Sequence, residues 1–174
     1  MNSFGPLSRT VALAGLFSVA LFSAPALAAK ADVDLLRSYI GSWKGKGQLI
    51  GAEAETVVCR LTLTEGNNDK VNYAGRCSMA GTNLAVSGTL AYNDQAKRYE
   101  AAMTSNATFS GMAVGKKSGN GVVFNLREQE KDEEGNDLTI TSQIALNGGK
   151  IRVEFNVVFK TTGDMLKASV PFTK

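Results

Sequence analysis

The chain has 174 residues, of which 44% are apolar and 20% charged, and its formal net charge is only +3. This composition suits one globular domain with a hydrophobic core and excludes disorder, collagen and coiled coil, while the small, evenly spread charge does not indicate a nucleic-acid-binding surface. The sequence contains no histidine, which excludes an imidazole base, a His-ligated zinc ion and a haem held by a proximal His.

Residues 1–28 have the pattern of a cleaved secretory signal. A basic start precedes an apolar run over 11–22, and residues 24–28 place alanines at the spacing that signal peptidase recognises. We expect cleavage after Ala28, because an apolar run this short and ended by proline does not suit a membrane anchor. The remaining 29–174 is predicted to be a single domain without a membrane span, located in a bacterial periplasm or secreted.

One helix and a series of strands are predicted after this signal. Residues 31–40 show helical spacing of apolar side chains, with Asp32 as the expected N-terminal cap. From Gly41 onward apolar and polar residues alternate, interrupted by Gly, Asn and Asp clusters, which is the pattern of consecutive antiparallel strands. We predict about ten strands, with cores at 42–50, 56–64, 71–79, 84–92, 98–105, 108–115, 122–130, 138–146, 151–160 and 165–172.

The turns predict how neighbouring strands pair, because the apolar residues of both strands must share one face. The turns used are Gly148-Gly149, Thr162-Gly163 and the connection 93–97. The pairs that result are, in the same order, Leu146 with Ile151, Phe159 with Leu166, and Tyr92 with Tyr99. The opposite faces are polar, which is the reverse of an outer-membrane barrel.

These hairpins predict an all-β fold. Consecutive hairpins form an up-and-down meander, and closure of such a meander removes both exposed edges. We therefore expect an antiparallel barrel of eight to ten strands, most simply ten, rather than a sandwich.

Cys59 and Cys77 are predicted to form a disulfide. The two thiols lie in an exported chain, and the midpoint between them falls in the turn-like segment 66–69. The same pairing sets Leu61 opposite Gly75, so the apolar residues share the face of the cysteines. A redox pair is disfavoured, because the residues lie within strands and there is no Cys-x-x-Cys motif.

The inward-facing positions combine bulky residues with glycine, alanine and serine. In a barrel of eight or more strands such a mixture leaves room for a small ligand. The alternative is that the large side chains fill the space above the glycines, or that the glycines let bent strands turn. The candidate ligand-lining residues are Trp43, Tyr73, Tyr99, Met103, Phe109, Phe124 and Phe155.

No sequence motif indicates catalysis, a metal site or a cofactor. The acidic run 128–137 does not match a calcium loop and is typical of a solvated hairpin tip. Motifs for a serine nucleophile are absent from the sequence. An enzyme built on this barrel would need an inward Asp or Glu near a second polar group, and Glu128 is the one inward carboxylate that the predicted register offers. We therefore expect a protein without enzymatic activity.

The segment Gly41-Ser42-Trp43-Lys44-Gly45-Lys46-Gly47, with a short helix before it and a meander after it, resembles the calycins, which include lipocalins, fatty-acid-binding proteins and nitrobindin-like barrels. The resemblance implies a ligand-binding barrel in which Trp43 packs across the closed end. In nitrobindin-like proteins the haem iron takes a His, which this chain lacks, so that activity is not implied.

The chain is also similar to small exported bacterial metalloprotease inhibitors, which share a Gly-x-Trp-like opening, a barrel and one disulfide. In that family an N-terminal segment inserts into the protease, and here the role would fall on residues 29–34. The leading hypothesis is a non-enzymatic barrel that binds a small apolar molecule in its lumen. The alternative is a protein-binding module, such as an inhibitor of an exported hydrolase or protease.

Overall fold

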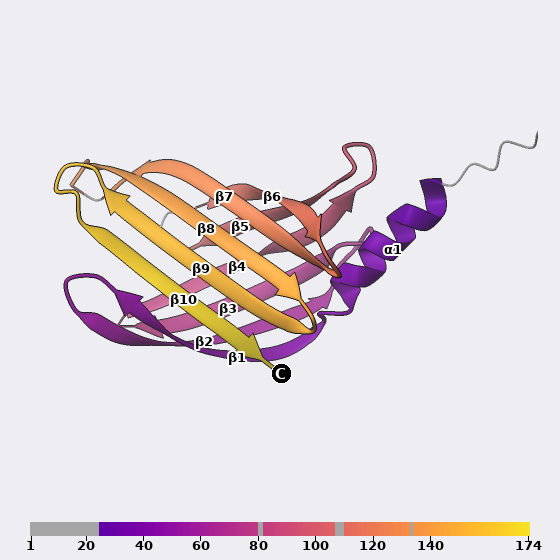
Figure 1. The fold of residues 1–174 in the computed structure, drawn as a ribbon, viewed down its shortest axis with the longest axis horizontal. Coiled ribbons are helices and arrows are strands. Elements are labelled where there is room, and N and C mark those ends of the chain that lie inside the picture. Colours follow the sequence, from indigo (N-terminus) through magenta and orange to yellow (C-terminus); the bar gives the residue numbers. More distant parts are fainter. Residues whose placement is uncertain (1–24, 80–81, 107–109, 133) are drawn as a thin grey trace, which may run out of the picture.

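Ten antiparallel strands follow one helix along the chain and close into a barrel (Figure 1). The structure is a computed structural model that describes residues 25–174 except 80–81, 107–109 and 133. The elements are α1 (Pro25–Arg37), β1 (Gly41–Ile50), β2 (Ala54–Glu65), β3 (Val71–Met79), β4 (Thr82–Asn93), β5 (Arg98–Ser105), β6 (Ser110–Ser118), β7 (Gly121–Lys131), β8 (Asp137–Asn147), β9 (Lys150–Phe159) and β10 (Met165–Thr173).

Each strand pairs with the next along the chain, and β1 pairs with β10 to complete the ring. This confirms the predicted all-β, up-and-down barrel with ten strands and a short N-terminal helix. Because the ring is closed, every strand has a neighbour on both sides. The β6–β7 pairing is the shortest, since it runs from Val114 with Asn125 to Ser118 with Gly121 and does not extend to the other ends of these strands. Among the residues that the structure describes, no helix is long and apolar enough to span a membrane.

The predicted pairing is confirmed in two hairpins and corrected in a third. Leu146 pairs with Ile151 across Gly148 and Gly149, whose positive φ angles of 57° and 68° suit a two-residue turn, and the predicted β4–β5 pairing is also found. The predicted turn between β9 and β10 is wrong. Residues 160–164 form a longer connection, which pairs Leu166 with Val157. Because this shift covers two positions, the same side chains still face inward.

The helix differs from its prediction at both ends. It begins at Pro25 and ends at Arg37, whereas helical spacing predicted residues 31–40. Asp32 therefore lies inside α1 and cannot be its N-terminal cap.

The disulfide between Cys59 and Cys77 is present, and it joins directly opposed residues of β2 and β3 whose Cα atoms are 4.1 Å apart. Cys59 is buried, and both cysteines belong to the inward face. The bridge therefore fastens two neighbouring strands from inside the barrel. A disulfide of this kind is typical of proteins that fold in an oxidising, exported location.

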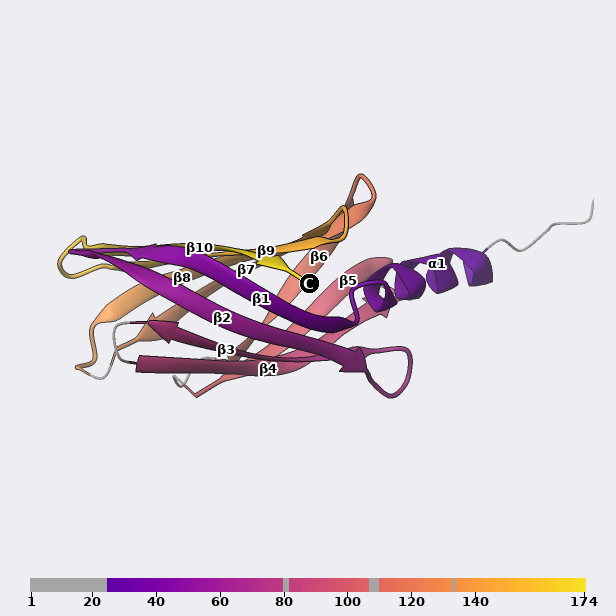
Figure 2. The ribbon, with the colours of Figure 1, turned by 90° about the horizontal axis from the view of Figure 1, so that it is seen from below.

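Helix α1 lies at one end of the barrel (Figure 2). Leu36 and Tyr39 are buried there against Trp43, whose Nε1 donates a hydrogen bond to the Tyr39 carbonyl oxygen at 3.0 Å. Lys174 lies over the Trp43 ring, 4.9 Å from its centre, and donates a hydrogen bond to the Ile40 carbonyl oxygen. We call this end the closed end of the barrel.

Candidate functional site

Burial of the inward side chains changes along the barrel axis. Near α1 the inward residues of β1, β3 and β10 are buried, for example Trp43, Val71 and Phe172. At the other ends of the same strands the inward residues are only half-buried, for example Leu49 and Met79. Solvent therefore enters the barrel opposite α1. We call this part the open half, and its half-buried inward apolar residues include Leu49, Met79, Val86, Met103, Phe155, Phe159 and Leu166.

Between the two halves lies a small internal cavity of about 10 Å³. This volume is close to the space for one water molecule. Its lining consists of Tyr73, Ala101, Met103, Gly111, Ala113, Phe124, Leu126, Ser142 and Ile144. The lumen is thus filled on the helix side. On the other side it is partly accessible, since Leu138 and Ile140 of β8 are buried there as well.

Glycines accommodate large side chains in the filled part. The Tyr73 ring passes over Gly88, and its hydroxyl donates a hydrogen bond to the Ala102 carbonyl oxygen at 3.0 Å. A Cβ atom at Gly88 would lie 1.9 Å from that oxygen. Burial raises the pKa of Tyr73 to about 12, so this phenol remains a neutral hydrogen-bond donor.

The residues predicted to line a ligand lie in different parts of the lumen. Trp43 is at the closed end, Tyr73, Met103 and Phe124 line the small cavity, and Phe155 is half-buried in the open half. Tyr99 packs edge-on against Phe124 with ring centres 6.3 Å apart. Phe109 lies outside the described residues. Contact of these residues with a ligand stays a prediction.

A buried carboxylate joins α1 to the barrel wall. Asp32 is 8% exposed, and its Oδ1 accepts hydrogen bonds from the Tyr99 hydroxyl at 2.6 Å and from Lys117 Nζ at 3.0 Å. Burial by itself would raise the pKa of Asp32, but the hydrogen bonds and the Lys117 charge outweigh it and lower the pKa. Burial and the bond to Asp32 raise the pKa of Tyr99.

The role of Asp32 was missed at the level of sequence, although a signal existed. Asp32 and Leu36 are four residues apart and so share one face of the helix. The face that buries Leu36 also points Asp32 at the barrel. This network fastens α1 to the barrel end from which the helix projects (Figure 2).

Three glutamates lie at inward positions of the open half: Glu55, Glu128 and Glu130. Glu128 was expected there, and its Oε1 lies 3.2 Å from the position that a Cβ of Gly111 would occupy. Glu55 was missed, because β2 begins at Ala54 and the predicted strand core began one residue after Glu55. It shares the inward face of Val57 and Cys59, and it pairs with Leu49.

Glu55 and Glu128 have no hydrogen-bond or ion-pair partner within the described part of the chain. The Oε2 atom of Glu55 is buried and accepts no hydrogen bond there. β2 and β7 are separated by five steps around the ring of ten strands, so Glu55 and Glu128 lie on opposite walls. An unpartnered buried carboxylate oxygen is costly unless something supplies a donor.

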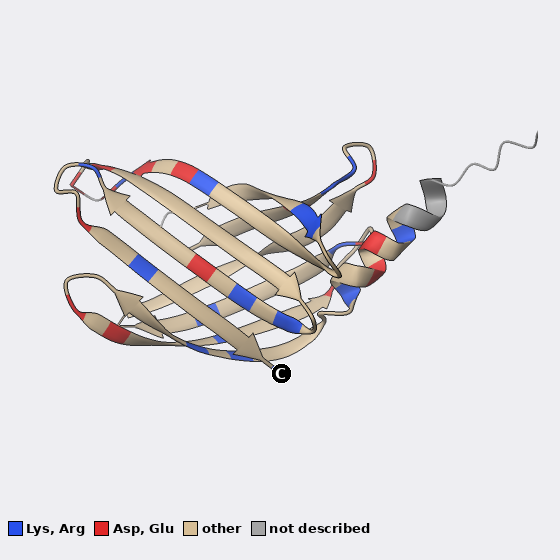
Figure 3. Cartoon of the chain, in the orientation of Figure 1, with Lys and Arg blue, Asp and Glu red and all other residues tan. Residues whose placement is uncertain are grey.

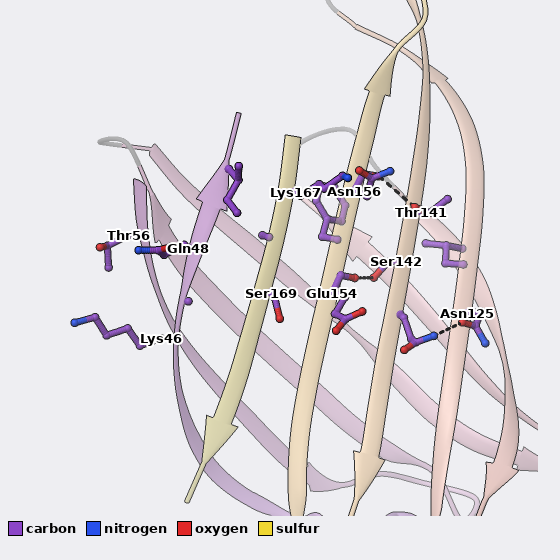
Figure 4. Close-up of a pocket in the computed structure, with 16 residues that line it drawn as sticks. Lys46, Gln48, Thr56, Asn125, Thr141, Ser142, Glu154, Asn156, Lys167 and Ser169 are labelled. Carbon is purple, nitrogen blue, oxygen red and sulfur yellow. Dashed lines mark hydrogen bonds between the residues drawn. The ribbon is translucent and has the colours of Figure 1, made fainter. Parts of the chain in front are cut away.

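A second hollow lies on the outside of the barrel (Figure 4). It is an open groove of about 970 Å³ across β1, β10, β9, β8 and β7. Its outward side chains are mostly amides, hydroxyls and lysines, including Lys46, Gln48, Asn125, Gln143, Asn156, Lys167 and Ser169. Gln143 donates a hydrogen bond to Asn125 at 3.0 Å, and the Ser142 hydroxyl donates to the Glu154 carbonyl oxygen at 3.2 Å. The groove is therefore a hydrated sheet surface rather than an apolar pocket.

Metal binding finds no support in the ranges that the structure covers. No three or more Cys, Asp or Glu side chains there converge as ligands of one ion would. The acidic loop between β7 and β8 uses Asp132 to organise its own turn, since Oδ1 accepts the backbone N–H of Asn136 at 2.7 Å.

Comparison with known proteins identifies the fold. No family model and no curated protein matches the chain. The crystal structure of Rv2717c from M. tuberculosis is similar, with a TM-score of 0.60 and 11% identity over 82% of this chain and 97% of that chain. An S-type phycobiliprotein lyase, CPES from Guillardia theta, has a TM-score of 0.49 and 9% identity, covering 80% of this chain and 89% of that one. A redesigned β-barrel, mFAP0, bound to DFHBI, has a TM-score of 0.39 and 9% identity, covering 76% and 97%.

The likeness to Rv2717c shows a shared ten-stranded barrel fold. At this identity the fold alone transfers, because one barrel architecture carries many unrelated functions. The class defined by fold and site is therefore a closed antiparallel barrel with one plugged end and one accessible end.

Proposed function

We propose that this protein is an exported, non-enzymatic barrel that binds a small apolar ligand in the open half of its lumen. The observation that carries the proposal is the half-exposure of apolar side chains that point inward, such as Met79, Phe155 and Leu166. Apolar surface in contact with water inside a concave site is what a ligand of matching character would bury.

A binding role is favoured over catalysis by the placement of the inward acids. Paired acid–base catalysis needs two groups within hydrogen-bond reach of one reacting centre. Glu55 and Glu128 stand on opposite walls, and neither contacts another polar side chain in the described part of the molecule. The protein is therefore proposed to act by binding.

Export and the calycin-like assignment belong to the same proposal. The disulfide supports an oxidising compartment. Cleavage after Ala28 would produce a domain over 29–174 that retains Asp32 and Leu36, the two residues that fasten α1. Trp43 at the closed end supports membership of the calycins, with the periplasm as the proposed location.

The alternative, a protease inhibitor, would need residues 29–34 free to enter a partner. In the structure this segment belongs to α1, and Asp32 binds Tyr99 and Lys117 of the barrel. The segment is therefore fastened to the barrel through Asp32, and the ligand-binding interpretation is preferred.

Mass spectrometry of the protein purified from its native compartment tests this proposal. Spectra are recorded on the intact protein under gentle conditions and again after solvent extraction. We expect an apolar molecule at one copy per chain that solvent releases, and reduced loading in Met103→Trp, which fills the inner end of the open half. Protein that is empty when isolated and also fails to take up added apolar molecules would contradict the proposal.

A further inference from the structure

Charge inside the open half has one sign. Among its described inward positions the ionisable residues are Glu55, Glu128 and Glu130. The inward lysine of β6, Lys117, lies at the closed end, where it is paired with Asp32 at 3.0 Å. The accessible part of the lumen is therefore acidic, although the whole chain carries a net charge of +3.

The described loop residues around the opening carry mostly negative charge as well. Residues 51–53, 132–136 without 133, and 160–164 contain Glu53, Asp132, Glu134 and Asp164 against the single base Lys160. Lysine and arginine residues are spread instead along the strands (Figure 3), and Lys131 at the end of β7 is paired with Asp137 at 2.8 Å. A concave, low-dielectric site lined by one sign of charge concentrates ligands of the opposite sign.

Glu55 supplies a specific acceptor within this acidic opening. Its side chain is half-buried among the inward apolar residues, next to Leu49, and its Oε2 is buried without a hydrogen-bond donor in the described structure. A bound ligand that carries an N–H donor would form a charge-assisted hydrogen bond with this carboxylate. The apolar part of such a ligand would cover Met103 and Phe155.

We infer that the ligand is an amphipathic organic cation, with an apolar body in the open half and an ammonium head at Glu55. Glu128, on the opposite wall, adds negative charge to the same space. This inference rests on the proposed lumen-binding function and adds to it the chemical class of the ligand.

Three probes with one shared alkyl chain test the inference: decylamine, decanol and decanoate. Their dissociation constants are measured by calorimetry at neutral pH on the full mature domain. We expect decylamine, protonated at that pH, to bind about tenfold more tightly than decanol and decanoate to bind most weakly.

Isosteric variants show which glutamate causes the preference for decylamine. Glu55→Gln is expected to weaken decylamine binding about tenfold and to leave decanol binding unchanged, since only the charged acceptor is lost. Glu128→Gln is expected to weaken decylamine binding by a smaller factor. Glu154→Gln, on the outer face of β9, is the matched control and leaves all three affinities unchanged.

The outcomes separate the two proposals. Decanol binding with no preference for decylamine, or a preference that survives in the Glu55→Gln, Glu128→Gln double variant, overturns the cation inference and leaves lumen binding standing. Binding of none of the probes counts against lumen binding itself. Near-ultraviolet circular dichroism of each variant shows whether the fold is retained, and Glu128→Gln provides the result if Glu55→Gln is unfolded.

Discussion

The packing of Tyr73 depends on the absence of a side chain at Gly88, the residue that it pairs with on β4. The Tyr73 hydroxyl reaches the Ala102 carbonyl oxygen only because Gly88 leaves room beneath it. In Gly88→Ala the new Cβ would lie 1.9 Å from that carbonyl oxygen and 2.8 Å from the hydroxyl. Since the first of these neighbours is backbone, the strand itself must shift.

We therefore expect Gly88→Ala to lower the free energy of unfolding by about 1 to 3 kcal/mol. Urea unfolding followed by fluorescence measures the change. Ser87→Ala, at the exposed neighbouring position, is the control and is expected to change stability by less than about 0.5 kcal/mol. Equal stabilities of the two variants would contradict this account of the packing.

Asp32 makes stability depend on pH in a defined direction. Its pKa is lowered in the folded protein from the ordinary value of 3.8. The ionised form therefore stabilises the fold at pH values above 3.8, and this stabilisation is lost as the pH falls through the lower folded-state pKa. Asp132, Asp137 and Glu100 also have lowered pKa values, so wild type alone cannot isolate the effect of Asp32.

Comparison of wild type with Asp32→Asn isolates the contribution of Asp32 to the pH dependence of stability. At neutral pH we expect this variant to be less stable than wild type by about 1 to 3 kcal/mol, the usual value of hydrogen bonds to a charged group. The difference is expected to shrink below pH 3.8, as measured by urea unfolding across a pH series. A difference that stays constant through the acidic range would show that the Asp32 charge has no role, and Asp34→Asn on the exposed face of α1 is the matched control.

At the scale of elements, the disulfide joins β2 and β3 across a sequence separation of 18 residues. Reduction restores conformational freedom to the unfolded chain and is expected to lower the free energy of unfolding by about 2 to 4 kcal/mol. Urea unfolding with and without a reductant measures this difference. The Cys59→Ala, Cys77→Ala double variant, which is insensitive to reductant, is the control, and an unchanged midpoint for reduced wild type would contradict the prediction.

At the scale of the whole molecule, the barrel has one tightly packed half and one accessible half. Local opening requires least free energy where few apolar contacts must be broken. We expect amide hydrogens near Met79 and Leu166 to exchange faster than those near Trp43 and Phe172, which are buried at the closed end. Hydrogen exchange with mass spectrometry measures the gradient, and uniform protection along the strands would contradict it.

Much of the fold was predictable from local patterns. Alternation along each segment located the ten strands, because a strand with one buried face repeats every two residues. The glycine pair at 148–149 was sufficient for one hairpin register. The segment 160–164 was not sufficient to predict the register of β9 and β10, since Gly163 alone does not reveal how many residues the connection uses.

The candidate site was less predictable for a physical reason. Alternation shows that Tyr73, Met103 and Phe155 point inward, but it does not give the distance between walls or the depth along the axis. Glu55 was missed because it is the second residue of β2, where element ends are hardest to locate. Its unpartnered oxygen appears only when all neighbouring strands are in place.

The sequence by itself determined the all-β class, the order of the strands, the faces that point inward and the pairing of Cys59 with Cys77. These properties follow from a period of two residues and from turn chemistry, which act over short stretches of chain. Only the tertiary structure decided that Asp32 fastens α1 to one end, that the lumen is filled on that side, and that an acidic opening remains on the other. Those properties depend on which side chains meet across the barrel, and no local pattern records distances of that kind.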